Sequence, residues 1–134
     1  MITITEYTKE TGKISRMISA TLPETLEINK KDGFDYLIGE GYSQTQYILN
    51  EEIIERPIFT PQIDKQTILA NGTDIVTISN LIGGEKSVQL KGPVSDQWVE
   101  QNTEFALTVN IQGSYTVKIT KWPYQDAEVS FNAT

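Results

Sequence analysis

The sequence predicts an all-β protein, because its apolar residues alternate with polar ones over short runs that turn residues separate. Successive residues of a strand point to opposite faces of a sheet, so this alternation places one apolar face against a core. No stretch shows the longer apolar repeat of an amphipathic helix over a useful length. The 134 residues suffice for one ordinary domain or two very small ones, and 38% of them are hydrophobic, which is typical of folded protein.

The first part of the chain is expected to form a small β module of hairpins. Its opening residues alternate β-branched or aromatic side chains with polar ones, and a turn around Gly12 separates them from a second run of the same kind. A second hairpin is expected to turn at Asn50 and Glu51, whereas residues 22–33 are interpreted as a loop. The predicted strands of this module are residues 2–7, 14–18, 35–39, 47–49 and 53–55.

Two prolines mark the expected boundary between this module and the rest of the chain. Pro57 and Pro61 remove backbone donors, and they disfavour a central strand that continues through them. We therefore divide the chain into an N-terminal β module of residues 1–57, a linker of residues 58–61 and a second domain of residues 62–134.

The second domain shows about seven short strands at turn spacings of roughly 8 to 12 residues, which is the pattern of an antiparallel sandwich. The pair Asn71 and Gly72 tolerates the positive φ of a tight turn. Phe105, Leu107 and Val109 share one face of their strand, as the period of two requires. The predicted strands of this domain are residues 65–69, 74–79, 87–91, 97–99, 104–109, 115–119 and 127–133.

The segment after Gly113 predicts that this sandwich is immunoglobulin-like. Such domains place a conserved tyrosine, the tyrosine corner, near the start of a late strand, and Tyr115 has that position. Val117 then takes the place of the usual second cysteine. Because the chain has no Cys, hydrophobic burial is expected to hold the two sheets together.

Composition excludes several kinds of chemistry. Without Cys or His the chain lacks thiol nucleophiles, imidazole bases and the usual zinc ligands, so we predict no enzyme, no catalytic residues, no metal site and no cofactor. The formal net charge of −7 disfavours a nucleic-acid partner. No apolar run reaches the length of about 20 residues that crosses a bilayer, so no membrane insertion is expected.

Paired carboxylates and two glycosylation-like sequences are interpreted as surface and turn chemistry. The carboxylates could in principle serve a glycosidase or hold a hard cation, but their spacing matches no calcium loop. Asn71 and Asn132 fit the acceptor pattern for N-glycosylation and are interpreted as parts of a turn and of the chain end. The carboxylate pairs are Glu24 with Glu27, Asp32 with Asp35, and Glu51 with Glu52.

Aromatic residues supply the candidate interface. Aromatics within strands, such as Trp98, are assigned to the core. Trp122, Pro123 and Tyr124 instead form a corner next to a proline, where fewer sheet neighbours can bury them. The sequence does not decide whether these three residues belong to the core or to an interface. They are the candidate interface residues that it proposes.

The run of residues 68–78 resembles the opening of bacterial immunoglobulin-like domains found in adhesins and phage proteins. The fuller pattern adds the strand of residues 105–109, the Gly-x-Tyr-x-Val segment around Tyr115 and the Trp122 corner. It is similar to the C-terminal module of small tailed-phage proteins, in which a β segment like residues 47–57 commonly comes first. The resemblance implies a virion component, most often tail-associated, with no catalytic residues to transfer.

These observations predict a non-enzymatic structural component of a tailed-phage virion. We expect a tail- or fibre-attachment protein that docks through its N-terminal module and displays the immunoglobulin-like domain. Capsid decoration and a module that binds host-surface glycans or proteins are the alternatives. The expected partners are other virion proteins of the tail, fibre or capsid, further copies of the chain, and host-surface glycans. The expected location is the virion, after synthesis in the bacterial host cytoplasm.

Overall fold

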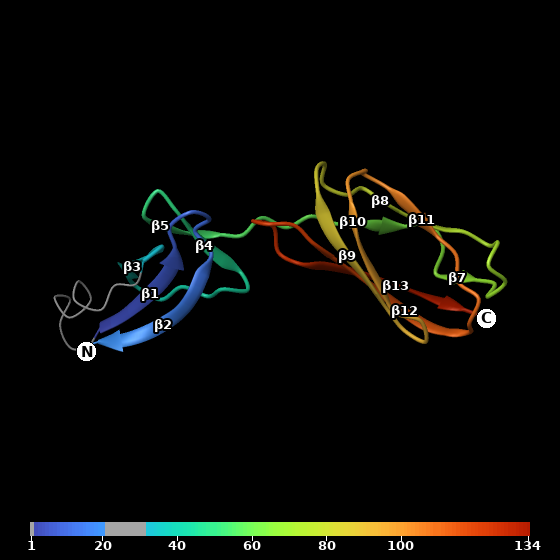
Figure 1. Ribbon diagram of the computed structural model, residues 1–134, viewed down its shortest axis with the longest axis horizontal. Coiled ribbons are helices and arrows are strands. Elements are labelled where there is room, and N and C mark those ends of the chain that lie inside the picture. The colour runs from blue at the N-terminus through green and yellow to red at the C-terminus, as the bar shows by residue number, and fades with distance from the viewer. Residues whose placement is uncertain (1, 21–31) are drawn as a thin grey trace. The chain divides into compact units, whose positions relative to one another are not determined.

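The computed structural model describes residues 2–20 and 32–134, and these residues form strands and no helix (Figure 1). The prediction of an all-β fold is thereby confirmed. The chain divides into two compact units, Met1–Pro57 and Ile58–Thr134. Of the predicted loop at residues 22–33, residues 22–31 lie outside the described residues.

The first unit contains a three-stranded antiparallel sheet with the order β2-β1-β3 and a separate hairpin of β4 and β5. The turn between β1 and β2 uses Gly12, whose φ is 76°. A Cβ atom there would overlap the carbonyl oxygen of Ile48, so only glycine allows β4 to approach this turn. The strands are β1 (Ile2–Thr8), β2 (Ile14–Ala20), β3 (Phe34–Ile38), β4 (Gln46–Leu49) and β5 (Glu52–Glu55).

A two-residue turn joins β4 to β5, as the sequence predicts. Leu49 pairs with Glu52, so Asn50 and Glu51 alone form the loop. Their φ angles are 51° and 63°, and positive φ at both central residues is the signature of a type I′ turn. Asparagine tolerates this conformation, whereas glutamate adopts it at a cost.

The core of the first unit is small. Among the described residues, its buried hydrophobic side chains are Ile4, Tyr7, Ile14 and Ile48. The last three form one cluster, and Leu37 and Ile53 pack against it. The hairpin of β4 and β5 therefore supplies part of the apolar surface that one face of the sheet needs.

The second unit is a sandwich of a five-stranded sheet, ordered β10-β9-β12-β13-β7, and a three-stranded sheet, ordered β11-β8-β6. Neighbouring strands pair antiparallel, as the sequence predicts, except that β7 runs parallel to β13. The strands are β6 (Gln62–Ile63), β7 (Thr67–Ile68), β8 (Val76–Ser79), β9 (Lys86–Lys91), β10 (Asp96–Glu100), β11 (Phe105–Leu107), β12 (Gly113–Thr120) and β13 (Ala127–Ala133).

The tyrosine corner confirms the immunoglobulin-like character of this sandwich. The hydroxyl of Tyr115, on β12, donates a hydrogen bond to the backbone carbonyl of Ile111, four residues upstream, at 2.7 Å. Val117 is fully buried at the position that a disulfide cysteine would occupy. Hydrophobic contact therefore joins the two sheets where other domains use a covalent bond.

Phe59 belongs to the core of the second unit. It is buried, and its ring packs edge-to-face on that of Tyr124, with centroids 5.9 Å apart. Residues 58–61, expected as a linker, thus include a core residue of the sandwich. The reason is that burying the apolar surface of an aromatic ring lowers the free energy of the folded chain. The buried core residues are Phe59, Ile68, Val76, Ile78, Leu81, Val88, Leu90, Val109, Tyr115, Val117, Ile119, Phe131 and Ala133.

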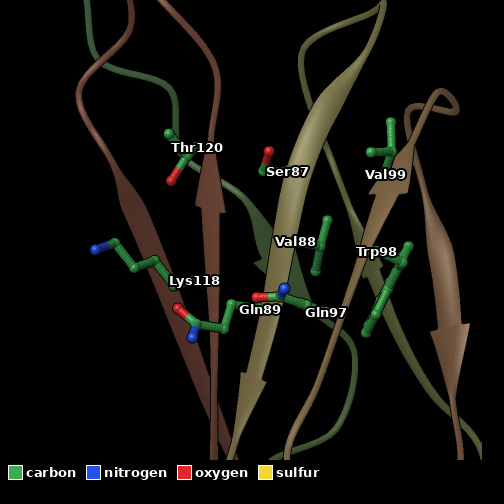
Figure 2. Close-up of a pocket in the computed structure, with 8 residues that line it drawn as sticks. All are labelled: Ser87, Val88, Gln89, Gln97, Trp98, Val99, Lys118 and Thr120. Atoms are coloured by element: carbon green, nitrogen blue, oxygen red, sulfur yellow. The ribbon is translucent and has the colours of Figure 1, made fainter.

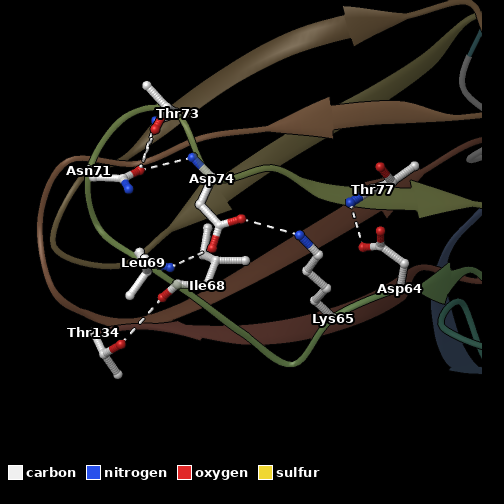
Figure 3. Close-up of polar contacts among 9 residues, drawn as sticks. All are labelled: Asp64, Lys65, Ile68, Leu69, Asn71, Thr73, Asp74, Thr77 and Thr134. Carbon is white, nitrogen blue, oxygen red and sulfur yellow. Dashed lines mark hydrogen bonds and ion pairs between the residues drawn. The ribbon is translucent and has the colours of Figure 1, made fainter.

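The loop from β7 to β8 is held by side chains that accept backbone hydrogen bonds (Figure 3). Asn71 Oδ1 accepts from the backbone amides of Thr73 and Asp74 and from the Thr73 hydroxyl, at 2.8 to 2.9 Å. A carboxylate oxygen of Asp74 accepts from the amide of Leu69 at 2.8 Å. The Asn71 side chain thus acts as a turn residue, as the sequence interpretation assigned it.

Candidate binding surface

The predicted corner lies between β12 and β13. Trp122, Pro123 and Tyr124 are all half-buried, and the peptide bond between the first two is cis. The contact of Tyr124 with Phe59 places this corner at the end of the sandwich where the chain enters from residue 58. One of the three side chains therefore serves the core, and an interface role for the corner stays a prediction.

A broader candidate lies on the outer face of the five-stranded sheet. There β10, β9 and β12 border a shallow hollow of about 430 Å³ (Figure 2). The outward-pointing residues alternate with the buried ones along each strand, so they follow from the same period of two that builds the core. The lining residues are Ser87, Val88, Gln89, Gln97, Trp98, Val99, Lys118 and Thr120.

Sheet register arranges the polar side chains of this hollow in rows. Gln97 lies opposite Gln89, and Gln89 lies opposite Lys118, so amide, amide and ammonium groups cross three strands in one line. In the next row Ser87 stands between the exposed side chain of Val99 and Thr120. Side chains directly opposite each other on antiparallel strands are about 5 Å apart at Cβ, which lets one ligand contact both rows.

Three polar side chains of the hollow can bond to a ligand. Within the part of the chain that the structure describes, the side-chain amides of Gln89 and Gln97 and the hydroxyl of Ser87 make no internal hydrogen bond. The charge of Lys118 is balanced by Asp126, with Nζ and Oδ2 3.3 Å apart. The hollow therefore offers uncharged donors and acceptors more than it offers a net charge.

Trp98 contributes to the hollow from a position in the core. Its ring packs edge-to-face on Phe105, with centroids 5.6 Å apart, and the side chain is half-buried. Aromatic rings favour this perpendicular arrangement because the positive ring edge meets the negative face of its neighbour. The sequence assignment of Trp98 to the core agrees with this contact.

Two buried ionisable residues were not singled out from the sequence. Lys86, on the inward face of β9, donates from Nζ to the carbonyl of Gly84 at 2.8 Å. Burial lowers the pKa of Lys86, the negative charge of Glu100 opposes that change, and the positive charge of Lys121 adds to it. The alternation along the strand could have revealed it, because Lys86 lies on the same side of β9 as the buried residues Val88 and Leu90.

Glu6 is the other buried ionisable residue, and it is only 1% exposed at the centre of the sheet in the first unit. Its carboxylate accepts from Tyr36 Oη at 2.9 Å, from Ser15 Oγ at 3.0 Å and from Arg16 Nε and Nη2 at 3.2 Å. Burial raises the pKa of Glu6, but these hydrogen bonds and the charge of Arg16 together bring it below the usual value. The carboxylate itself is buried, and both of its oxygens accept hydrogen bonds from β2 or β3, so it joins the three strands of the sheet.

The remaining candidates from the sequence show structural roles or lie outside the described residues. Among the described residues, no cluster of acidic side chains could hold a metal ion. No helix within residues 2–20 and 32–134 is long and apolar enough to span a membrane. Of the acidic pairs, Asp35 accepts a hydrogen bond from the amide of Tyr36, whereas Glu24 and Glu27 lie outside the described residues.

Comparison with known proteins yields only distant structural likeness. The sequence matches no protein-family model and no curated protein. Two crystal structures of glycosyl hydrolase family 2 members from Bacteroides cellulosilyticus resemble it, with TM-scores of 0.39 and 0.37 and sequence identities of 10% and 9%. They cover 98% and 96% of this chain, which spans only 21% and 22% of their length. At these scores the likeness assigns neither a function nor a substrate.

Proposed function

We propose that the chain is a non-enzymatic structural component of a tailed-phage virion, most simply a tail- or fibre-attachment protein. In this proposal the first unit docks onto the particle and the second presents an immunoglobulin-like sandwich. The observation that carries it is the division into two compact β units whose buried ionisable groups are bonded internally. Such units provide surfaces for binding rather than groups for catalysis.

The sequence resemblance supplies the phage context. It rests on the segment around Tyr115, on the Trp122 corner and on the β segment of residues 47–57. Tyr115 forms the corner that the resemblance requires, which supports the immunoglobulin-like half of the proposal. The partners in this proposal are other proteins of the tail or of a fibre.

Mass spectrometry of purified phage particles tests the proposal. Peptides of this chain are expected in intact virions after nuclease treatment and density-gradient purification. Their absence, with the protein present in the lysate of infected cells, would disprove a structural role. Copy number separates the first proposal from capsid decoration: a few to a dozen copies per particle indicate a tail or fibre protein, and hundreds indicate a capsid protein.

A second candidate function is binding of a neutral host-surface glycan, and the hollow on β10, β9 and β12 favours it. Its free amide and hydroxyl groups match the hydroxyls of a sugar, and the exposed side chain of Val99 offers an apolar contact. The net charge of −7 favours a neutral glycan over an anionic one.

A glycan array probed with the full chain tests this second function. If the hollow binds sugar, the double substitution of Gln89→Ala and Gln97→Ala abolishes the signal, while Lys91→Gln, on the same strand but outside the hollow, leaves it intact. A blank array at high protein concentration, or equal binding by both variants, would exclude the hollow as a glycan site. Neither result bears on whether the chain is a virion component.

A further inference from the structure

Strand β2 leaves one long side of the sheet in the first unit without a partner among the described residues. It is seven residues long, pairs with β1 on one side only and stands at the end of the order β2-β1-β3. Ser15, Arg16, Met17 and Ser19 are all exposed along it. An unpaired strand of this length is a template for pairing with another chain.

The hydrogen-bond pattern identifies which backbone groups face outward. The carbonyl of Thr3 accepts a hydrogen bond at 2.9 Å from the amide of Gly39, the residue directly after β3. Thr3 therefore turns its backbone groups toward β3. Because this direction alternates along an antiparallel strand, Ile4 bonds to its partner Ile18 on β2. On β2 itself, Met17 and Ser19 therefore turn their N–H and C=O groups to the open side.

Charge distinguishes this edge from the edge strands β10 and β3. The only charged side chain on β2 is Arg16, and it is paired with Glu6, with Nη2 and Oε2 3.2 Å apart. By contrast, the edge strand β10 carries Asp96 and Glu100, and the edge strand β3 carries Asp35. Charges on an edge strand oppose its pairing with an identical strand, and β2 lacks an uncompensated one.

Apolar surface lies beside the open edge. Met17 is 46% exposed and Tyr42 is 51% exposed, and both line a hollow of about 230 Å³ next to β2. A strand added to β2 would lie beside this hollow, so backbone pairing and burial of apolar surface would favour the same contact.

We propose that β2 pairs antiparallel with β2 of a second copy of this chain, across a two-fold axis at Met17. The three strands of each copy then form one continuous sheet, and its contact is the same patch on both copies. This register places Arg16 opposite Ile18 of the second copy and avoids facing Arg16 with itself. The outward backbone groups of Met17 and Ser19 gain partners, and the pairing stands independently of any place in a virion.

Sedimentation of the full chain over a range of concentrations tests the pairing. We expect a reversible dimer, and Met17→Lys should raise its dissociation constant about tenfold or more, because two lysines then face each other across the axis. The matched control is Ile38→Lys, an exposed position on the opposite edge strand β3, which should leave the constant unchanged. A wild-type chain that stays monomeric at all concentrations, or a dimer that both variants weaken equally, would overturn the proposal.

Cross-linking decides the case if a lysine variant fails to fold. The chain has no Cys, so Met17→Cys places one thiol per copy. Directly opposite residues at the axis are about 5.5 Å apart at Cα, within the range that a disulfide spans. Oxidation should join two Met17→Cys chains rapidly and leave Ile38→Cys chains largely unjoined. Equal cross-linking at the two positions would refute pairing through β2.

Discussion

The two units of the molecule bury different kinds of surface. Among the described residues, the buried core of the second unit consists of thirteen hydrophobic side chains. The core cluster of the first unit consists of Tyr7, Ile14 and Ile48, and the central strand β1 also buries Ile4, Thr5 and Glu6. A sandwich of two sheets can enclose apolar residues from both, whereas a three-stranded sheet with one hairpin encloses few. The second unit therefore depends mainly on hydrophobic burial, and the first depends more on one bonded carboxylate.

The largest expected effect removes an aromatic side chain from the second core. Phe131 stacks on Tyr115 with centroids 5.2 Å apart and ring planes 8° apart. Phe131→Ala should lower the free energy of unfolding of the sandwich by about 3 to 5 kcal/mol, because it removes apolar contact and leaves a cavity. Trp98 and Trp122 are the only tryptophans and both belong to this unit, so denaturant unfolding followed by tryptophan fluorescence measures the loss.

The exposed Ile75 provides the matched control for that measurement. Ile75→Ala should change the same free energy by no more than about 0.5 kcal/mol. A loss as large as that of Phe131→Ala would show that exposed and buried apolar residues count equally, and would contradict the account of the core.

Glu6→Gln tests the polar core of the first unit. The amide keeps the shape of the carboxylate but loses the charge-assisted hydrogen bonds from Arg16, so the free energy of opening should fall by about 1.5 to 3 kcal/mol. Hydrogen exchange at the β1 amides measures this fall. Glu10→Gln, an exposed turn position, is the control and should leave the exchange rates unchanged. Unchanged protection of β1 in the Glu6 variant would refute the role given to the carboxylate.

Lowering the pH should weaken the first unit, because its buried carboxylate, Glu6, becomes protonated. Since folding lowers the pKa of Glu6 below its ordinary value of 4.5, its stabilising contribution is complete above that value and is lost as the pH falls through the folded pKa. The protection factors of the β1 amides, which correct for the intrinsic exchange rate at each pH, should therefore fall below about pH 4.5. The Glu6→Gln variant should show a weaker fall, and an identical pH profile of protection in both proteins would disprove the assignment.

A smaller effect is expected at the tyrosine corner. Tyr115→Phe removes the hydroxyl that bonds to the carbonyl of Ile111 while it keeps the ring against Phe131. The sandwich should lose about 1 kcal/mol, the usual net value of one hydrogen bond. Denaturant unfolding measures it, and a loss close to that of Phe131→Ala would mean that the ring, too, had been displaced.

The smallest effect should be stabilising and confined to the first unit. Glu51 has a φ of 63°, and glycine adopts this conformation without the steric cost that glutamate bears. Glu51→Gly should raise the stability of the hairpin of β4 and β5 by about 0.5 kcal/mol, because the relief of strain is partly offset by the greater freedom of glycine in the unfolded chain. Slower hydrogen exchange at the amides of Tyr47 and Ile54, which pair across the hairpin, would register the gain. Glu52→Gly, within β5, should have the opposite sign, so a gain in both variants would contradict the turn assignment.

Strand positions and the tyrosine corner could be predicted because they depend on neighbours along the chain. Asn50 and Glu51 lie between two apolar runs, and Tyr115 follows a glycine turn, so local pattern was enough for both. The two-residue strands β6 and β7 could not be predicted with the same precision. They are defined by pairing with β8 and β13, and two residues carry too little periodicity to reveal a partner.

By itself, then, the sequence determined the all-β class, the hairpin turns and the residues that face the core, because a period of two is a property of adjacent residues. Only the tertiary structure decided that Phe59 belongs to the sandwich, that Glu6 meets three donors and that β7 runs parallel to β13. It also brought Gln89, Gln97 and Lys118 into one row and, among the described residues, gave β2 no partner along its outer side. Those features depend on which strands lie side by side, and strand pairing is fixed by packing between distant segments of the chain.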